Sequence, residues 1–156
     1  MPKHYQPNLE SISTHTIPQW YHDSKFGIFI HWGIYSVPAF AQPTGRLGTI
    51  PFDERWFAYN PYAEWYCNSV RCGFGPSYEH HLKTYGKEFD YENFADLFKA
   101  ENYDPDEWAK LFAASGAKYV IPTTKHHDGF CLWNSAYTDY NAAVRGPGRD
   151  LMTPLC

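Results

Sequence analysis

The residues of this chain that are best suited to chemistry are histidines that follow apolar, β-branched runs. His31 lies near the end of KFGIFIHWG, and His126 and His127 follow KYVIPTTK, with Asp128 directly after them. Four interpretations fit these residue types: a metal site, an acid–base pair, a sugar-binding rim, or a surface loop without function.

A metal site needs three or four converging ligands, which could come from these histidines and Asp128. Adjacent side chains on a regular strand point to opposite faces, so His126 and His127 can bind one ion only where the backbone turns. A nucleophilic hydrolase has no better support, because the chain contains no G-x-S-x-G elbow. We therefore expect neither metal nor cofactor, and we keep a metal-dependent α/β hydrolase as an alternative.

Hydroxyl recognition suits these residues better. A neutral histidine both donates and accepts hydrogen bonds, and a neighbouring tryptophan covers the apolar face of a sugar. The chain offers Trp32 beside His31, Trp65 beside Glu64, and Trp133 after the second histidine group, and 19% of its residues are aromatic. The pattern favours carbohydrate recognition, although core packing explains many aromatic residues equally well.

The overall composition excludes several classes of partner. The chain has 156 residues, a net charge of −4 and 13 Lys and Arg that form no basic run, so we expect no nucleic acid partner. No stretch reaches the ~18 apolar residues of a membrane helix, and the first residues have no apolar signal region. We expect a soluble chain that is cytoplasmic as it stands, with four reduced cysteines outside any zinc or redox motif.

Two strands and one helix would position the histidines. Residues 26–35 and 118–123 are apolar, β-branched runs that predict strands buried on both faces. Asp104 as cap, Pro105 at the first helical position and Gly116 as a left-handed stop predict a helix over 105–115. Pro122 falls within the second strand, where its missing N–H is tolerated only at an edge, an end or a bulge.

Other segments complete the predicted organisation. Asn60 before proline predicts a helix over 62–70, a second helix spans 77–86, and Asp150 caps a further helix. Residues 38–60 and 125–149 are predicted as long loops. Strands that alternate with helices indicate an α/β protein with its active site at the carboxyl ends of its strands.

The motifs together resemble a known family. The segments WYHDSKFGIFIHWGIYSVPAF, YAEWY, AKLFAASGAKYVIPTTKHHDGFCLWNSAYTDYN and GPGRDL closely resemble the N-terminal part of the α-L-fucosidases of glycoside hydrolase family 29, in the same order and from about residue 20 to 155. The resemblance implies a (β/α)8 TIM barrel that removes terminal α-L-fucose from a fucosylated glycan or fucoside with retention and without a metal.

The resemblance also implies site residues and domain bounds. Residues 1–19 would be an N-terminal extension and 20–156 a partial catalytic domain, truncated after the first two or three barrel strands. Asp128 would orient the histidine loop. The fucose-binding residues would be His31, Glu64, Trp65, His126 and His127.

The catalytic carboxylates have no counterpart in this chain. A retaining glycosidase needs two carboxyl groups ~5–5.5 Å apart, and a barrel takes ~250 residues. Glu64 is the one carboxylate that could contribute to acid–base work, beside its hydroxyl-binding role. We expect the isolated chain to be an inactive fragment that aggregates or remains molten. The alternative from another class is a carbohydrate-binding remnant without chemistry.

Overall fold

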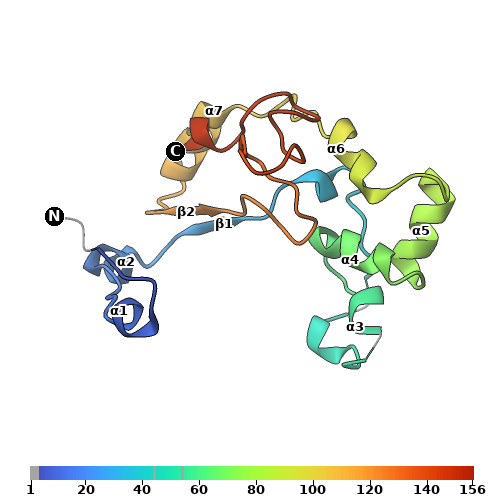
Figure 1. The fold of residues 1–156 in the computed structure, drawn as a ribbon, viewed down its shortest axis with the longest axis horizontal. Coiled ribbons are helices and arrows are strands. Elements are labelled where there is room, and N and C mark those ends of the chain that lie inside the picture. Colours follow the sequence, from blue (N-terminus) through green and yellow to red (C-terminus); the bar gives the residue numbers. More distant parts are fainter. Residues whose placement is uncertain (1–3, 44, 54) are drawn as a thin grey trace.

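The computed structural model describes residues 4–43, 45–53 and 55–156, and its helices lie at both ends of two short strands and on one side of them (Figure 1). The α-helices and strands are α1 (Leu9–Ser13), α2 (Gln19–Ser24), β1 (Ile28–Ile30), α3 (Arg55–Ala58), α4 (Tyr66–Arg71), α5 (Pro76–Tyr85), α6 (Phe94–Leu97), α7 (Pro105–Ala114) and β2 (Val120–Pro122). The 3-10 helices are η1 (Ile34–Ser36), η2 (Leu47–Thr49), η3 (Ala63–Trp65), η4 (Tyr91–Asn93) and η5 (Thr153–Leu155).

The two strands form a parallel sheet in which Phe29 lies opposite Ile121. This pairing confirms the α/β class, since parallel neighbours require a crossover and the helices α3 to α7 supply it. Both strands are shorter than predicted, because the chain turns into η1 soon after β1. Pro122 is the last residue of β2, a strand end at which its missing N–H is tolerated.

The prediction that both strands are buried on both faces is wrong. Phe29 is 64% exposed and its partner Ile121 is 44% exposed, so one face of the sheet is open in the described chain. On the other face, Val120 and Pro122 line a small hollow together with Phe112 of α7. An apolar run alone predicts a strand but not how many layers cover it.

Helix α7 begins and ends at the predicted signals. The Asp104 carboxylate accepts hydrogen bonds from the backbone N–H groups of Asp106 and Glu107, at 3.0 and 3.1 Å. Gly116 follows the helix with φ of +83°, the left-handed conformation that glycine adopts without a steric penalty. In the first turn, the Glu107 carboxylate pairs with the Lys110 ammonium at 2.7 Å.

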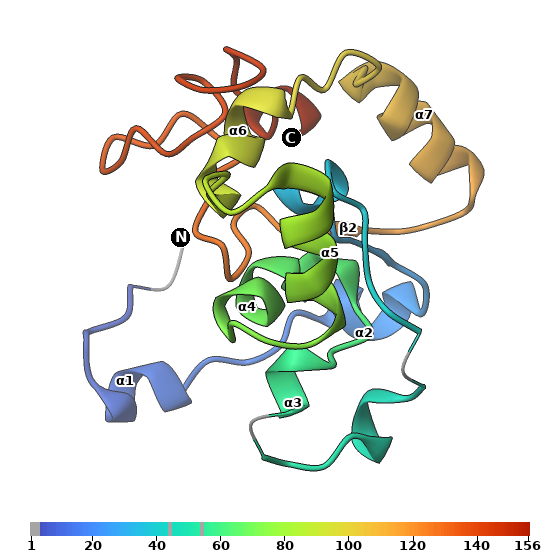
Figure 2. The ribbon, with the colours of Figure 1, turned by 90° about the vertical axis from the view of Figure 1, so that its right-hand side faces the viewer.

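The predicted helices over 62–70 and 77–86 correspond to η3 with α4 and to α5. The prediction that Asn60 caps the first of them is wrong: the Asn60 side chain accepts a hydrogen bond from the Tyr62 N–H at 2.9 Å, but η3 begins at Ala63 with Tyr62 as its N-cap residue. The segment 38–60 was expected to be a loop without regular structure, but it contains η2 and α3. Figure 2 shows α4 and α5 close together, with α3 beneath them.

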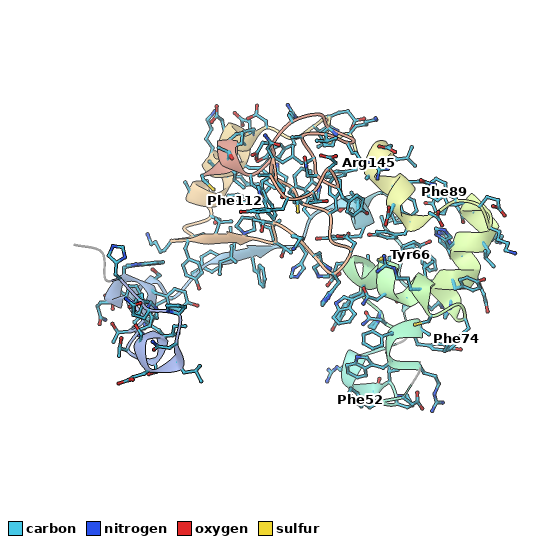
Figure 3. The ribbon with its side chains drawn as sticks, viewed as in Figure 1. Phe52, Tyr66, Phe74, Phe89, Phe112 and Arg145 are labelled. Carbon is cyan, nitrogen blue, oxygen red and sulfur yellow. The ribbon has the colours of Figure 1, made fainter. Side chains whose placement is uncertain are left out.

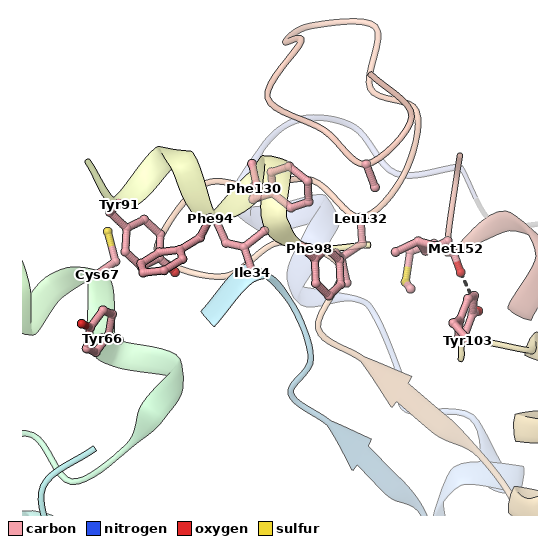
Figure 4. Close-up of a cluster of buried hydrophobic side chains, with 13 residues drawn as sticks. Ile34, Tyr66, Cys67, Tyr91, Phe94, Phe98, Tyr103, Phe130, Leu132 and Met152 are labelled. Atoms are coloured by element: carbon pink, nitrogen blue, oxygen red, sulfur yellow. Dashed lines mark hydrogen bonds between the residues drawn. The ribbon is translucent and has the colours of Figure 1, made fainter. Parts of the chain in front are cut away.

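The core lies beside the sheet and is largely aromatic (Figure 4). It joins η1, α4 and α6 to the long segment after β2, whose Leu151 carbonyl accepts a hydrogen bond from the Tyr103 hydroxyl at 2.6 Å. Asp150 accepts hydrogen bonds from the Met152 and Thr153 N–H groups at the start of η5, although the N-cap residue of this helix is Met152 and not Asp150 as predicted. Because these contacts join distant segments, the segment after β2 is held firmly against the helices.

Candidate functional site

The carboxyl ends of both strands bring histidines together. His31 directly follows β1, and His126 lies a few residues after β2. Their rings meet edge to face, with centroids 5.5 Å apart. The expectation that parallel strands would deliver these side chains to one edge of the sheet is confirmed.

A tight turn explains how two adjacent histidines reach the same place. The Gly129 N–H donates a hydrogen bond to the His126 carbonyl at 3.0 Å, and Gly129 has φ of +82°. The rings of His126 and His127 are therefore nearly perpendicular neighbours, with centroids 4.8 Å apart. His126 is half-buried, whereas His127 is exposed to solvent. The first imidazole is therefore packed against the protein, and the second is accessible to a ligand.

The 3-10 helix η3 adds the other predicted residues. The Trp65 indole lies beside the His127 imidazole, with ring centroids 4.5 Å apart. Glu64 directly precedes Trp65 in η3, and its charge acts to raise the pKa of both His126 and Tyr35. Residues from β1, η3 and the turn after β2 thus converge on one cluster.

Asp128 lies beneath this cluster and is bonded within the protein. One carboxylate oxygen accepts a hydrogen bond from the Phe130 N–H at 3.0 Å, and the other accepts one from the Tyr91 hydroxyl at 2.9 Å. Burial raises the pKa of Asp128, while these two donors oppose that rise. The bonding supports the interpretation that Asp128 orients the histidine loop and does not touch a ligand.

Tyr35 belongs to the cluster but was not predicted. Its buried ring packs against His126 with centroids 5.3 Å apart, and its hydroxyl has no hydrogen-bond partner within the described residues. Burial raises the pKa of Tyr35, with Asp128 and Glu64 adding to the rise, so the phenol stays protonated. The sequence places Tyr35 in an apolar run, where it is indistinguishable from a core residue.

The protonation of His126 suits hydrogen bonding. Burial lowers its pKa below 6.5, and the neighbouring His127 and His31 lower it further, while Asp128 and Glu64 oppose the change. The imidazole is therefore neutral at physiological pH, with one nitrogen able to donate a hydrogen bond and the other able to accept one.

The cluster is better suited to hydroxyl groups than to a metal ion. Among the residues that the structure describes, no three His, Cys, Asp or Glu side chains are arranged to hold one ion. Both carboxylate oxygens of Asp128 already accept hydrogen bonds. Three imidazoles, a half-buried carboxylate and an indole instead provide donors, acceptors and a flat apolar surface, as sugar binding requires.

Two of the three predicted tryptophans do not line the cluster. Trp32 packs among Phe98, Tyr103 and Trp108, with ring centroids 5.0–5.2 Å away. Trp133 is packed against the same core. An indole that is apolar enough for a sugar face is also apolar enough for a core, so the sequence could not separate the two roles.

Comparison with known proteins gives one consistent answer. The family model described as alpha-L-fucosidase matches residues 1–156. An α-L-fucosidase of Dictyostelium discoideum is 39% identical over 155 residues, covering 97% of this chain and 30% of that protein. A solved α-L-fucosidase structure is 62% identical with a TM-score of 0.90, covering 97% of this chain and 34% of the other.

A crystal structure of Thermotoga maritima α-fucosidase in complex with fucose is 58% identical, with a TM-score of 0.85 over 97% of this chain and 34% of that one. The chain therefore spans about a third of the length of the proteins it matches. Within residues 4–43, 45–53 and 55–156, no helix combines the length and apolar character needed to cross a membrane.

Proposed function

This chain belongs to the α-L-fucosidase family, glycoside hydrolase family 29, and we propose that it supplies the fucose-binding part of a retaining exo-α-L-fucosidase. The substrate class is a terminal α-L-fucoside of a glycan or oligosaccharide. The residues proposed to bind fucose are His31, Glu64, Trp65, His126 and His127.

The convergence of these side chains is the observation that supports the proposal. The imidazoles and the Glu64 carboxylate are suited to the sugar hydroxyls, while the Trp65 ring is suited to an apolar face of fucose or to a hydrogen bond through its N–H. They gather at the carboxyl ends of parallel strands, the edge at which barrel enzymes place their active sites.

The proposed architecture is the first part of a (β/α)8 barrel, with residues 1–19 as an extension and 20–156 in the catalytic domain. In this arrangement β1 and β2 are neighbouring barrel strands, α7 covers their outer face, and Phe29 and Ile121 point into the barrel. The open face of the sheet supports this proposal, because side chains of further strands would cover it.

The sequence predicts that the isolated chain aggregates or remains molten, but the described residues share one aromatic core, so we propose instead that the chain folds and binds fucose without hydrolysing it. A retaining mechanism requires a nucleophile and an acid–base residue ~5–5.5 Å apart. Asp128 is buried and bonded to Tyr91, which leaves Glu64 as the free carboxylate of the described cluster. The remaining carboxyl groups would come from segments that this chain does not contain.

Binding of free sugar tests this proposal directly. Saturation-transfer NMR on the 156-residue chain should detect L-fucose and give no signal for D-fucose, its mirror image. The variant H127A should abolish the L-fucose signal, whereas H22A, an exposed histidine on α2, should leave it unchanged. Equal signals for both enantiomers would contradict a built fucose site.

Catalysis is tested in a hybrid enzyme in which this chain replaces the matching segment of the Thermotoga maritima α-fucosidase. The hybrid should hydrolyse 4-nitrophenyl α-L-fucoside with retention and should keep its activity in the presence of a chelator. A hybrid that binds fucose but shows no turnover would instead favour the second candidate, a sugar-binding role without chemistry. Glu64 as the lone free carboxylate of the cluster is the observation that favours that candidate.

A further inference from the structure

The short helix α3 presents an aromatic ring beside the candidate site. The ring of Phe57 stacks on the Trp65 indole, with centroids 5.7 Å apart and planes inclined by 25°. Trp65 in turn contacts His127. Phe57 therefore lies one ring further from His127 than Trp65 does.

The backbone beneath this ring is anchored. The Ser69 hydroxyl of α4 donates a hydrogen bond to the Phe57 carbonyl at 2.7 Å. Ala58 is buried so tightly against Gly75 that a Cβ on that glycine would lie 3.0 Å from the Ala58 carbonyl oxygen. Asn60, also buried, ends the same segment. The position of Phe57 is thus fixed by the packing of α3 on α4 and α5.

The ring itself is open to solvent. Phe57 is 42% exposed although its neighbour Ala58 is fully buried. A fixed, exposed aromatic ring binds a flat apolar group at a low entropic cost, because few side-chain rotamers are lost on binding. A ring of this kind next to a sugar site suits recognition better than core packing.

An ion pair precedes the ring in the chain. The Arg55 guanidinium pairs with the Asp53 carboxylate through hydrogen bonds of 3.0 and 3.1 Å from its Nε. This pairing holds the pKa of Asp53 below its usual value.

We propose that Phe57 forms a platform for the leaving group, the part of the substrate to which fucose is attached, with the fucose-binding Trp65 between it and the histidines. The ligand chemistry is an uncharged group with a flat apolar face, either an aryl ring or the C–H face of a pyranose. This inference rests on the proposed function, because it places the leaving group beyond the fucose-binding residues.

The test compares ligands that differ only in the leaving group. Dissociation constants of methyl α-L-fucoside, 4-nitrophenyl α-L-fucoside and α-L-fucosyl-(1→2)-D-galactose are measured by NMR for the chain, for F57A and for F52A. Phe52 is a matched control: it is an 88% exposed phenylalanine that contacts Trp56 at the tip of the same region (Figure 3).

The F57A variant should weaken binding of the nitrophenyl fucoside, the disaccharide or both by about 3- to 10-fold, the range expected of one aromatic contact. Binding of the methyl fucoside should stay within about 2-fold, and F52A should change none of the three. A loss for the nitrophenyl ligand alone identifies an aryl platform, and a loss for the disaccharide alone identifies a sugar platform.

Two results would overturn the platform while leaving the fucose site intact. Equal weakening of all three ligands would mean that Phe57 only supports Trp65. Unchanged binding of all three would mean that the exposed ring is covered by another part of the protein.

If the chain binds no fucoside, the same comparison is made in the hybrid enzyme. There F57A should lower kcat/KM for the nitrophenyl fucoside but not for α-L-fucosyl fluoride, whose leaving group has no ring. A hybrid in which F57A leaves the ratio of the two kcat/KM values unchanged overturns the platform. If the chain does not bind fucosides and the hybrid shows no turnover, both the proposed function and the platform are wrong.

Discussion

The Trp65 indole and the His127 imidazole lie with their centroids 4.5 Å apart, although Trp65 precedes α4 and His127 follows β2. Each ring therefore limits where the other can lie. The affinity for a ligand that contacts one ring therefore depends on the position of the other ring.

This contact predicts energetic coupling in fucose binding. A double-mutant cycle of W65A and H127A should give an interaction energy of about 0.5–1.5 kcal/mol, as aromatic pairs do. The cycle of W65A with H31A is the control, because the recorded ring contacts of His31 are with Phe29 and His126. Additive effects in the first cycle would mean that the two rings act independently.

Protonation of His126 predicts how binding depends on pH. Because burial and His127 lower its pKa, the H127Q variant should raise that pKa toward 6.5, as measured by NMR titration of the imidazole. Fucose binding through the neutral ring should fall as the pH decreases through the pKa. An unchanged His126 titration in H127Q would show that burial alone sets the pKa.

The lowered pKa of His126 also makes the free energy of unfolding depend on pH. The folded state holds the His126 proton less tightly than the unfolded state, whose pKa lies near 6.5. The contribution of His126 to stability is therefore complete above that value and is lost as the pH falls toward the lower folded pKa. Denaturant midpoints of the hybrid enzyme between pH 7.5 and about 5, with H126Q for comparison, measure this loss.

The Tyr91–Asp128 hydrogen bond predicts two separate effects. The variant Y91F should raise the pKa of Asp128 further, because the Tyr91 donor now opposes the rise that burial causes. The variant D128A should lower the free energy of unfolding by about 1–3 kcal/mol, since it leaves a buried hydroxyl without a partner. Carboxyl NMR and denaturant unfolding of the hybrid enzyme measure these effects.

For Asp128, the sign of the pH dependence is opposite to that of His126. Its raised pKa means that the folded state binds the proton more readily, so the stability contribution falls as the pH rises through the shifted pKa. An Asp128 titration that is the same in Y91F and in the parent chain would contradict the role of the hydrogen bond.

Two glycines of the segment after β2 provide a matched pair. Gly146 and Gly148 have similar φ values of +67° and +65°, but a Cβ on Gly146 would lie 2.2 Å from the Ala95 carbonyl oxygen, whereas Gly148 has open space. G148A should cost about 1–2 kcal/mol for the left-handed backbone alone. G146A should cost about 2–4 kcal/mol, because steric overlap adds to that strain.

Thermal or denaturant unfolding of the hybrid enzyme distinguishes the two variants. Equal destabilisation by G146A and G148A would show that the backbone of α6 shifts at little cost to make room for a Cβ at residue 146. A larger loss for G146A would confirm that the segment after β2 is fitted closely to the backbone of α6.

The sequence was sufficient for features that depend on short-range rules. Asp104 and Gly116 mark the ends of α7 because capping requires those residue types at those positions. His31 and His126 could be placed together because parallel strands end at one edge of the sheet. These inferences need a local pattern and one rule of topology.

Long-range side-chain contacts could not be predicted in the same way. Nothing in the local sequence indicates that Tyr91 bonds to Asp128, or that Phe57 stacks on Trp65. Trp32 follows His31 and so could have covered a sugar face, but it lies in the core, because an apolar ring fits both environments. The exposure of Phe29 likewise depends on which layers cover the sheet, which an apolar run does not specify.

The buried bond between Asp128 and Tyr91 also matters to a protein engineer. The exposed histidine turn could be grafted onto another scaffold as a short peptide, but Tyr91 belongs to η4, well before α7 in the chain. A graft of the turn alone would leave Asp128 without its hydroxyl donor. The transferable unit is therefore discontinuous, and a successful transplant must include the tyrosine as well as the histidines.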